Sequence, residues 1–313
     1  MAPLHACRIL VTGGAGFIGS HLVEALLNQG YQVRVLDNLS SGKLHNLPMN
    51  NPSLRVTIGD VADLTTVEQA VTGCSAVVHL AAVASVQASV DDPVGTHHSN
   101  FAGTLNVCEA MLKASVKRVV FASSAAIYGN NGEGISVNED IAKSPLTPYA
   151  SDKLAGEYYL DFYRREHGLE PVILRFFNIF GPRQDPSSPY SGVISIFTLL
   201  AVAGQQIKVF GDGSQTRDFV FVTDLVGVIR QAVAASAPPN EPVNVGLGRS
   251  TSLNQIIEEL ASIIGIVPNV AYLEPRAGDI QHSRADTTRL RTHFSLPDPV
   301  SVREGLAQLI RSL

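Results

Sequence analysis

The sequence predicts an α/β protein: a doubly wound parallel sheet with helices on both faces, followed by a smaller C-terminal α/β lobe. Short apolar runs alternate with segments of helical periodicity through the first half of the chain, as is typical of parallel strands joined by crossover helices. The first of these runs leads directly into a glycine-rich turn. The pattern changes after about residue 177, where Pro, Gly and Ser gather at 181–192, so we expect the second lobe to begin there.

Apolar segments of the first half are predicted to be strands, because their apolar residues are continuous or alternate and each segment ends at a turn. In chain order they span 7–13, 31–38, 53–60, 75–82, 117–129 and 170–182. The first runs into glycine, the second alternates and ends in Asp, and the fifth ends in small residues. Helices are predicted where apolar residues recur at helical spacing. They span 17–30, which ends in Gly, 64–73, much of 90–115, and the segment that carries Tyr149.

The later elements are shorter and mixed. The segment 207–225 is predicted to form a strand, a turn and a second strand, and 242–246 forms one more strand. Helices are predicted at 252–264 and 301–312 from their apolar spacing. Some of these late segments are expected to return to the first sheet.

Composition narrows the class of protein. The 313 residues are sufficient for two domains, and 23 basic against 28 acidic residues give a net charge of −5, which argues against a nucleic-acid binder. Cys7, Cys74 and Cys108 lie far apart without a CxxC pair, so we expect reduced thiols in a cytoplasmic protein. No apolar run reaches the roughly 18 residues of a membrane span, and the N-terminus lacks a signal-peptide pattern.

The turn "VTGGAGFIGSHL" places Gly13, Gly16 and Gly19 between the first strand and the first helix. Glycine permits a tight turn and close approach of a pyrophosphate, and the following helix offers unpaired N–H groups at its start. Asp37 ends the next strand, where a carboxylate accepts hydrogen bonds from an adenosine ribose and repels a 2′-phosphate, which favours NAD over NADP. Asp60, after the third strand, is either an adenine contact or a solvated acid at a strand end.

Tyr149 and Lys153 are four residues apart in "TPYASDKLAGEYY". On a helix they share one face, one turn apart. From spacing alone, the two side chains are either a packed structural pair or an acid–base pair.

Five segments in order carry a resemblance: "TGGAGFIG", "HLAA" (79–82), "SSAAIYG" (123–129), YxxxK and "RFFNIFGP". Together they resemble the extended short-chain dehydrogenase/reductase family, and within it the UDP-hexose 4-epimerases. The resemblance runs over nearly the whole chain. It implies a Rossmann-type domain at 1–176, to which 218–247 returns, and a UDP-sugar-binding lobe at 177–217 and 248–313. It also implies NAD as cofactor, a UDP-sugar as substrate, and a homodimer formed through the helices at 90–115 and 150–168.

The resemblance implies a catalytic triad of Ser124, Tyr149 and Lys153, with Ser124 at the end of the preceding strand. Tyr149 is expected to be the base, because Lys153 and the positive nicotinamide both favour a phenolate whose free pKa is near ~10. Lys153 is also expected to hold the nicotinamide ribose, and Ser124 to bind the reacting oxygen of the sugar.

Further binding residues follow from the resemblance. Asn100 is expected to brace the active-site backbone. Arg217 and Arg276 suit the diphosphate of the substrate, because the guanidinium fork is bidentate and always charged. The residues expected to contact the cofactor are Gly13, Gly16, Phe17, Ile18, Gly19, Asp37, Asn38, Asp60, Val61, Leu80, Ala81, Ala82, Asn100, Tyr149, Lys153 and Phe177. Those expected to contact the substrate are Ser124, Tyr149, Asn178, Val193, Arg217, Arg276, Asp279 and Ser283.

Some positions separate the possible reactions. Ala125 and Ala126 follow Ser124, where the related 4,6-dehydratases carry acidic residues and the related decarboxylases carry a Glu nearby. Ala84 departs from the Lys that the galactose-type enzymes often have, which puts the nicotinamide contacts around 83–86 in doubt. The adjoining His97 and His98 lack a third ligand at metal spacing, and His79 lies on a buried strand, so we predict no metal.

The predicted function is therefore NAD-dependent C4 epimerisation of UDP-hexoses through a 4-keto intermediate. Ser283 aligns with the position that, in the family that the chain resembles, lines the pocket near the 2-substituent of the sugar. A small residue there leaves room for an N-acetyl group. This favours the interconversion of UDP-N-acetylglucosamine and UDP-N-acetylgalactosamine over that of the plain hexoses. The alternatives are a nucleotide-sugar reductase or dehydratase of the same fold, and a non-catalytic dinucleotide sensor.

Overall fold

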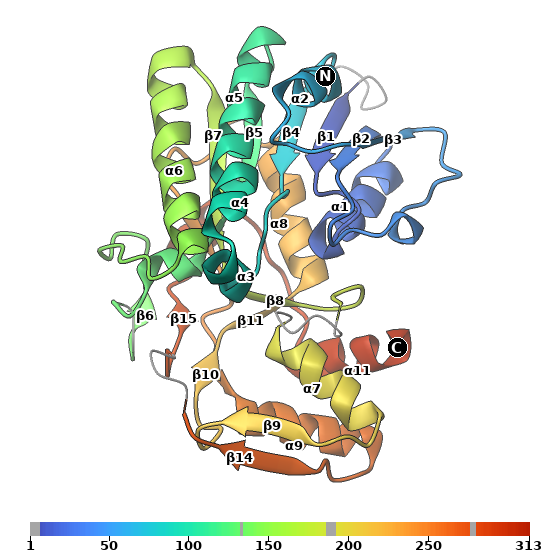
Figure 1. Ribbon diagram of the computed structural model, residues 1–313, viewed down its shortest axis with the longest axis vertical. Helices are drawn as coiled ribbons and strands as arrows, with labels where there is room; N and C mark the ends of the chain where they lie inside the picture. The colour runs from blue at the N-terminus through green and yellow to red at the C-terminus, as the bar shows by residue number, and fades with distance from the viewer. Residues whose placement is uncertain (1–6, 132–133, 186–191, 276–279) are drawn as a thin grey trace. The chain divides into compact units, whose positions relative to one another are not determined.

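A computed structural model describes residues 7–131, 134–185, 192–275 and 280–313 (Figure 1). The chain divides into two compact units, each assembled from separate stretches. The first consists of Met1–Ile127, Pro145–Arg175 and Val226–Val243, and the second of Tyr128–Ser144, Phe176–Leu225 and Asn244–Leu313. Residues 226–243 thus return to the first unit, while 128–144 group with the second. The assignment of NAD binding and UDP-sugar binding to separate domains stays a prediction.

The central element is a seven-stranded sheet with the order β12-β7-β5-β4-β1-β2-β3. Its strands are β1 (Arg8–Thr12), β2 (Gln32–Asp37), β3 (Leu54–Ile58), β4 (Ala76–His79), β5 (Arg118–Ser124), β7 (Glu170–Phe176) and β12 (Val243–Val245). The chain winds outward from β1 to β3 and then crosses to β4 on the other side of β1. The strand order therefore reverses between β1 and β4, and ligands of open α/β sheets bind at such a reversal, outside the carboxyl ends of the strands. The predicted fold class is confirmed.

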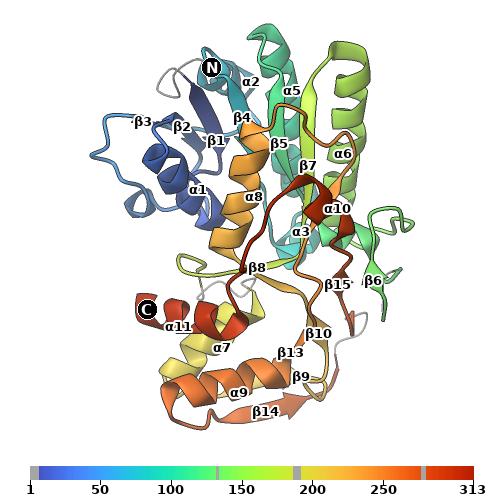
Figure 2. The same cartoon turned by 180° about the vertical axis from the view of Figure 1, so that it is seen from behind.

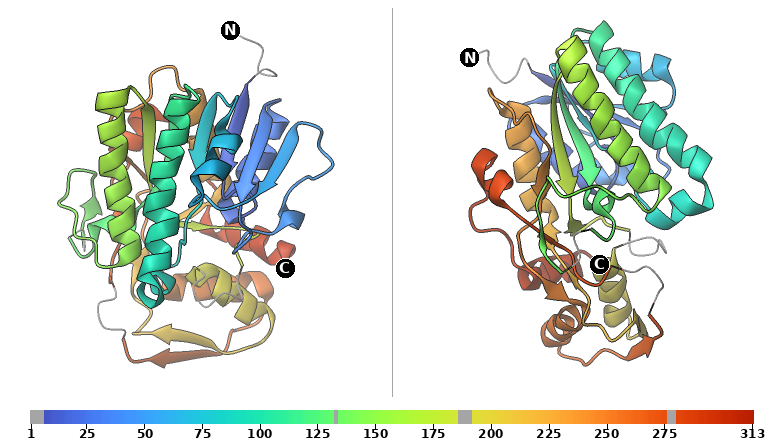
Figure 3. Two further views of the ribbon diagram at one scale, coloured as in Figure 1. Left: turned by 45° about the horizontal axis from the view of Figure 1, so that its top comes forward. Right: turned by 90° about the vertical axis from the view of Figure 1, so that its left-hand side faces the viewer.

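Helices cover both faces of this sheet (Figures 1 and 2). Helices α2, α5 and α6 lie on one face, with α5 and α6 side by side, and α1 and α8 lie on the other (Figure 3). The helical segments are α1 (Phe17–Asn28), η2 (Leu44–Asn46), α2 (Leu64–Val71), α3 (Val86–Asp91), α4 (Pro93–His97), the π-helical turn η3 (His98–Ala102), α5 (Gly103–Lys113), η4 (Ala125–Tyr128), α6 (Pro148–His167) and α8 (Val222–Ala234). The apolar core on the face of α2, α5 and α6 includes Leu10, Val77, Met111 and Phe121.

Helix α6 has clear start and stop signals. The side chain of Thr147 accepts a hydrogen bond from the Ala150 N–H group, and Pro148 occupies the first turn, where its missing N–H costs nothing. Gly168 ends the helix in the left-handed conformation with φ 68°. The helix therefore begins one residue before Tyr149, which places Tyr149 and Lys153 on its first two turns.

The second unit contains several small two-stranded sheets and a group of packed helices. Its strands are β6 (Ser136–Val137), β8 (Asn178–Phe180), β9 (Ile207–Phe210), β10 (Thr216–Arg217), β11 (Phe219–Phe221), β13 (Thr251–Ser252), β14 (Val270–Leu273) and β15 (Arg284–Ala285). Its remaining helices are α7 (Val193–Val202), α9 (Leu253–Ile264), α10 (Thr288–His293) and α11 (Val302–Ser312). Strand β8 pairs with β11, β9 with β14 and β6 with β15 in parallel, while β10 and β13 are antiparallel. Helices α7, α9 and α11 pack against one another.

The structure differs from the sequence prediction in four elements. The predicted helix in 90–115 is broken into α4, η3 and α5, and the strand predicted to reach residue 129 ends at Ser124. The strand predicted at 170–182 is interrupted because the Phe177 N–H bonds to the Val245 carbonyl and the Asn178 N–H to the Asp218 carbonyl, so the chain changes partner there. Helix α8 begins directly after β11 in a stretch rich in Val, which had indicated strand.

Among the helices in the described ranges, none combines the length and the apolar character needed to cross a membrane.

Candidate functional site

The turn between β1 and α1 requires glycine at two positions. Gly13 has φ +69°, and a Cβ atom there would lie 2.8 Å from the Ala81 backbone nitrogen. A Cβ at Gly19 would lie 2.1 Å from the Gly13 carbonyl oxygen. The turn is thus packed directly against the segment that follows β4, at the point where the strand order reverses. Helix α1 then begins at Phe17 with Gly16 as its N-cap, which supplies no side-chain bond to the first N–H groups.

Asp37 is buried at the end of β2 and holds this turn in place. Its carboxylate accepts hydrogen bonds from the Ala15 N–H at 2.9 Å and the Leu39 N–H at 2.8 Å. A carboxylate has about four lone-pair positions, so it retains capacity for further donors. Next to it, Asn38 donates to a carboxylate oxygen of Asp60 at 2.9 Å, which joins the loops after β2 and β3.

Two asparagines brace the loops that follow the strands. Asn100, in η3, accepts from the Val83 N–H at 2.7 Å and donates to the Val83 carbonyl at 3.1 Å. Asn106, one turn into α5, donates to the carbonyls of Val61 at 3.0 Å and Ala62 at 2.9 Å. Sequence reasoning missed Asn106, since an Asn within a helix has no local signal for a contact with a distant loop.

His79 lies at the end of β4 between two threonine hydroxyls. Its Nδ1 is 2.8 Å from Thr12 Oγ1, and its Nε2 is 3.1 Å from Thr104 Oγ1. Burial and the nearby Lys153 charge lower the pKa of His79 to about 3, so the ring is neutral at physiological pH. Thr12 also accepts from the Ala81 N–H at 3.2 Å. The histidine is thus part of the scaffold that orders 80–82.

The predicted catalytic residues come together at the carboxyl end of β5. Ser124 lies beside Tyr149, close enough for its hydroxyl to lower the pKa of the phenol, and it accepts a hydrogen bond from the Ala126 N–H at 3.2 Å. Lys153 Nζ lies 5.9 Å from the centroid of the Tyr149 ring and 5.0 Å from that of Phe121. The Lys153 side chain is nearly completely buried, at 4% exposure.

Burial governs the titration of this group. It raises the pKa of Tyr149, and the hydrogen bond from Ser124 opposes that rise. Burial also lowers the pKa of Lys153 to about 8, while the carboxylate of Asp152 opposes that shift. The Lys153 ammonium lies 5.9 Å from the centroid of the Tyr149 ring. That Lys153 favours the phenolate stays a prediction.

A buried ion pair lies behind the predicted triad. Glu157, one turn after Lys153 on α6, accepts from Arg175 Nε at 2.9 Å and Nη2 at 2.7 Å, and from Ser123 Oγ at 2.5 Å. Glu157 is 4%, Arg175 3% and Ser123 2% exposed. The pair joins α6, β7 and the residue before Ser124. Sequence reasoning missed it, although the i, i+4 spacing from Lys153 placed Glu157 on the same helix face.

The second unit holds most of the predicted substrate residues. Asn178 begins β8, and the partly buried Val193 is the first residue of α7. Phe177, which was predicted to contact the cofactor, is buried in the same unit. Arg217 in β10 donates through Nη1 to the Gln281 carbonyl at 3.3 Å, and the Ser283 N–H donates to the Thr216 carbonyl at 3.2 Å. Arg217 and Ser283 therefore belong to adjoining segments.

Arg276 and Asp279 lie outside the described residues.

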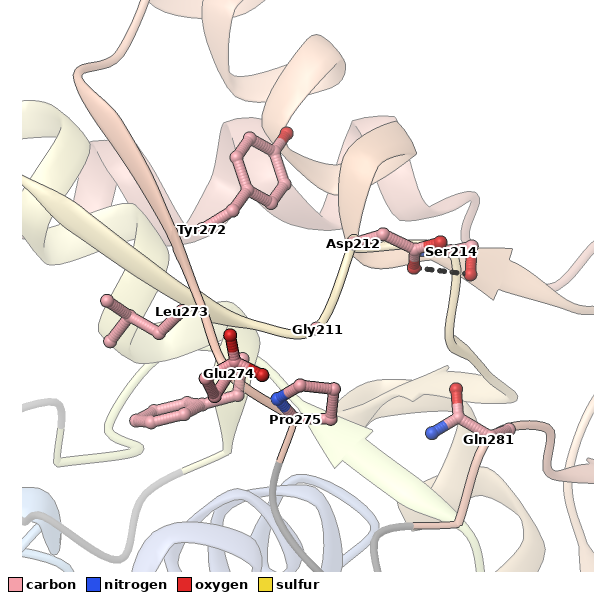
Figure 4. Close-up of a pocket in the computed structure, with 9 residues that line it drawn as sticks. Gly211, Asp212, Ser214, Tyr272, Leu273, Glu274, Pro275 and Gln281 are labelled. Carbon is pink, nitrogen blue, oxygen red and sulfur yellow. Dashed lines mark hydrogen bonds between the residues drawn. The ribbon is translucent and has the colours of Figure 1, made fainter.

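A cavity of about 720 Å³ opens at the ends of β9 and β14 in this unit (Figure 4). Phe210, Gly211 and Asp212 line it from β9 and the turn that follows, Tyr272 lines it from β14, and Glu274 lines it from just after that strand. Gln281, whose carbonyl accepts from Arg217, also lines it. Its volume lies within the range of about 300–1,000 Å³ that is usual for small-molecule sites.

In the part of the chain that the structure describes, no three His, Cys, Asp or Glu residues lie close enough to hold a metal ion. The expectation that no metal takes part stays a prediction.

Comparison with known proteins decides the family. The model of the NAD dependent epimerase/dehydratase family matches residues 9–246, which is most of the chain. This chain belongs to that family. The resemblance seen in the motifs is thereby confirmed, and so is the prediction of NAD as the family's cofactor.

Relatives within the epimerase/dehydratase family match the chain over nearly its full length. A UDP-glucose 4-epimerase of Mycolicibacterium smegmatis is 39% identical, with 97% of each chain covered. The structure of a UDP-N-acetylglucosamine 4-epimerase from Methanobrevibacter ruminantium, in complex with UDP-N-acetylmuramic acid, superimposes with a TM-score of 0.93 at 36% identity, covering 98% of this chain and 97% of the other. A Thermus thermophilus UDP-glucose 4-epimerase in complex with NAD gives a TM-score of 0.88 at 36% identity, covering 97% of this chain and 98% of the other.

The residues around the first turn fit the family's cofactor. The close packing at Gly13 and Gly19 leaves backbone, not side chains, at the turn, and α1 presents N–H groups there. Asp37 stands at the end of the adjacent strand β2, while Tyr149 and Lys153 lie on α6, which packs against β5, two strands from β1 on its other side. These positions together would hold NAD.

Proposed function

We propose that this protein is an NAD-dependent UDP-hexose 4-epimerase that prefers the N-acetylated sugars. The observation that carries the proposal is the placement of Ser124 at the Tyr149 hydroxyl, with Lys153 one turn along α6, on the unit that carries the glycine turn. The nearly full-length match to two UDP-glucose 4-epimerases and one UDP-N-acetylglucosamine 4-epimerase supports it.

In this proposal Tyr149 removes the proton from the 4-hydroxyl of the sugar. Ser124 binds the same oxygen and is positioned by the N–H of Ala126. When bound, NAD would supply the acceptor that takes the hydride from C4 and returns it to the other face of the 4-keto sugar, so that no net oxidation occurs, and its positive charge would favour the phenolate. Tyr149 returns the proton to the 4-oxygen.

Epimerisation is favoured over dehydration by the residues that follow Ser124. Elimination of water needs a further acid and base, and η4 begins with Ala125 and Ala126, which offer methyl groups only. A reductase would release a reduced cofactor at each turnover. A sensor would not require Ser124 beside Tyr149 with Lys153 one turn along the same helix.

We assign UDP to the second unit, through Asn178, Val193 and Arg217, and through Arg276 and Asp279. The cavity at β9 and β14 supports this assignment, because it combines the Phe210 and Tyr272 rings with a link to Arg217 through Gln281. Rings of this kind suit a base, and an Arg suits a diphosphate. Ser283, partly exposed and small, is assigned to the 2-substituent of the sugar and leaves space for an N-acetyl group.

The test is product analysis by NMR after incubation with UDP-N-acetylglucosamine and, separately, UDP-glucose. We expect the 4-epimer of each, with faster formation from the N-acetyl sugar. Absorbance of reduced nicotinamide should show no net change during turnover, and NAD should co-purify. A 4,6-dehydrated product, or stoichiometric NADH release, would overturn the proposal.

We further propose a homodimer that involves α5 and α6, with a second copy of this chain as the partner. Tyr158, Tyr159 and Phe162 on α6 are 64%, 44% and 41% exposed, and the Tyr159 ring contacts Phe101 with centroids 5.1 Å apart. Exposed aromatic rings clustered on one helix are typical of an interface. Light scattering should report a dimer for the wild type and a monomer for Tyr159→Lys combined with Phe162→Lys. Tyr272→Lys, at an exposed aromatic residue of the other unit, is the control and should leave the dimer intact.

A further inference from the structure

A second cavity, of about 590 Å³, lies in the first unit at the amino ends of β1, β2 and β3. Arg8 and Gln32, the first residues of β1 and β2, line it, as do Pro52 and Ser53 before β3. The glycine turn lies at the carboxyl end of the same strands. This cavity is therefore separate from the proposed NAD site.

Strand register brings three arginines to one face of the sheet. Arg8 pairs with Gln32, and Arg34 pairs directly with Arg55 on the neighbouring strand. Side chains of a strand alternate between faces, so Gln32 and Arg34 share a face, and their partners share it with them. The carbonyl oxygens of Gln69, Ala70 and Thr72, which accept from Arg34 Nη1 at 2.8–3.1 Å, identify it as the face of α2. All three arginines line the cavity.

Their positive charges have no negative counterpart among the described residues. Arg8 Nη2 donates to the Gln32 side-chain oxygen at 2.9 Å, and Arg55 Nη1 donates to the carbonyls of Pro52 and Leu54 at 3.3 and 3.0 Å. None of the three forms an ion pair with a described carboxylate, and the cavity lining contains no Asp or Glu. Like charges directly opposite on neighbouring strands destabilise a sheet. A chain with net charge −5 thus keeps three unneutralised guanidinium groups around one hollow.

We propose that this cavity binds a compact polyphosphate anion, namely a diphosphate or triphosphate group. Each arginine makes its described bonds through one terminal nitrogen, and a guanidinium fork has five N–H donors, so each retains donors for phosphate oxygens. Gln32, Ser53 and Gln69 add polar groups to the lining. The lining has no aromatic ring on which a base could stack, so recognition rests on the phosphates and not on a nucleoside.

Arg55 has an alternative role. It lies on β3, an edge strand of the sheet, and charges on an edge strand prevent edge-to-edge pairing with another molecule. That role predicts no bound anion and an effect of arginine removal on aggregation alone.

The experiment is calorimetric titration of the full chain with inorganic pyrophosphate, in the presence of saturating NAD and UDP so that the proposed cofactor and substrate sites are filled. We expect one further site with a dissociation constant tighter than about 1 mM. ATP should compete for it through its phosphates, whereas adenosine should not. Absence of binding under these conditions overturns the proposal, as does competition by adenosine.

Variants locate the site. Arg55→Gln should weaken pyrophosphate binding about 10-fold or more, as the loss of a charge-assisted pair implies, and Arg8→Gln should do the same. Arg55 is exposed and its described contacts are to carbonyls beside it, so this variant is expected to fold even if Arg8→Gln does not. Arg311→Gln, an equal charge change on the exposed last turn of α11, is the control. Equal weakening by Arg311→Gln and Arg55→Gln would mean non-specific attraction and would overturn the proposed site.

Discussion

Replacing Glu157 with Gln should separate the stability of the first unit from the positioning of its predicted catalytic residues. The change leaves the Arg175 guanidinium, 3% exposed, without its counter-charge, and an amide has one acceptor oxygen where the carboxylate uses two, Oε1 for Arg175 Nε and Oε2 for Nη2. Breaking a buried pair by removing one partner costs roughly 3–5 kcal/mol. Since Gln keeps one acceptor oxygen, we expect the lower end, about 3 kcal/mol of the free energy of unfolding. Most domains have about 5–15 kcal/mol, so the variant should fold.

The same variant should lower turnover beyond what lost stability explains. Ser123 Oγ donates to Glu157, and Ser123 precedes Ser124, which contacts Tyr149. A shift of about 1 Å in a reacting group costs up to roughly 100-fold in rate. We therefore expect kcat per folded molecule to fall about 10- to 100-fold, with KM and bound NAD changed little.

Three measurements on Glu157 variants check this reasoning: denaturant unfolding, kcat at a temperature far below the unfolding midpoint, and KM. Glu68→Gln is the matched control, because the Glu68–Lys113 pair is largely exposed and should contribute at most about 1 kcal/mol. The double change Glu157→Met with Arg175→Met should restore most of the stability, since no unpaired charge stays buried, but not kcat. If kcat recovers together with stability, the ion pair is structural only and the positioning role is refuted.

The remaining predictions concern the proposed chemistry directly. Tyr149→Phe should reduce epimerisation at least ~100-fold while NAD stays bound, as loss of a positioned base implies, and near-normal turnover would contradict the mechanism. Asp37→Asn keeps an acceptor for the Ala15 N–H but removes the charge, so the preference for NAD over NADP in binding assays should narrow. A wild type that already prefers NADP would show that the reading of Asp37 is wrong. Lys153 has a pKa of about 8 in the folded chain and an ordinary pKa of 10.5. Between these two pH values the unfolded chain binds more protons than the folded chain. The free energy of unfolding should therefore rise with pH across that window, by at most about 3 kcal/mol. Denaturant titrations should show this rise in the wild type and not in Lys153→Met; equal slopes would mean that the ammonium is not buried. Ser283→Tyr should depress turnover of the N-acetyl sugars and spare UDP-glucose, whereas equal losses would show that residue 283 does not line the 2-substituent pocket.

Local pattern was sufficient for the elements whose signals lie within one segment. The glycine turn, β1 to β5 and the early turns of α6 follow from spacing and from start and stop residues, because those signals act within one or two helical turns or one strand. The i, i+4 spacing of Tyr149 and Lys153 likewise predicted a shared face. The break at Phe177 was not predictable, since both sides of it are equally apolar and only the change of bonding partner, from β12 to the segment before β11, separates them.

Tertiary structure decided which distant residues meet. Ser123, Glu157 and Arg175 come from β5, α6 and β7, and Arg34 faces Arg55 only because β2 and β3 pair in one particular register. Such meetings depend on strand order and register, and a register shift of one residue would turn each side chain to the other face. The sequence by itself therefore determined the fold class and the glycine turn, and its motifs carried the prediction of the catalytic residues. Only the folded chain determined the buried ion pair behind them and the arginine-lined cavity, because both are set by contacts between segments that carry no signal for one another.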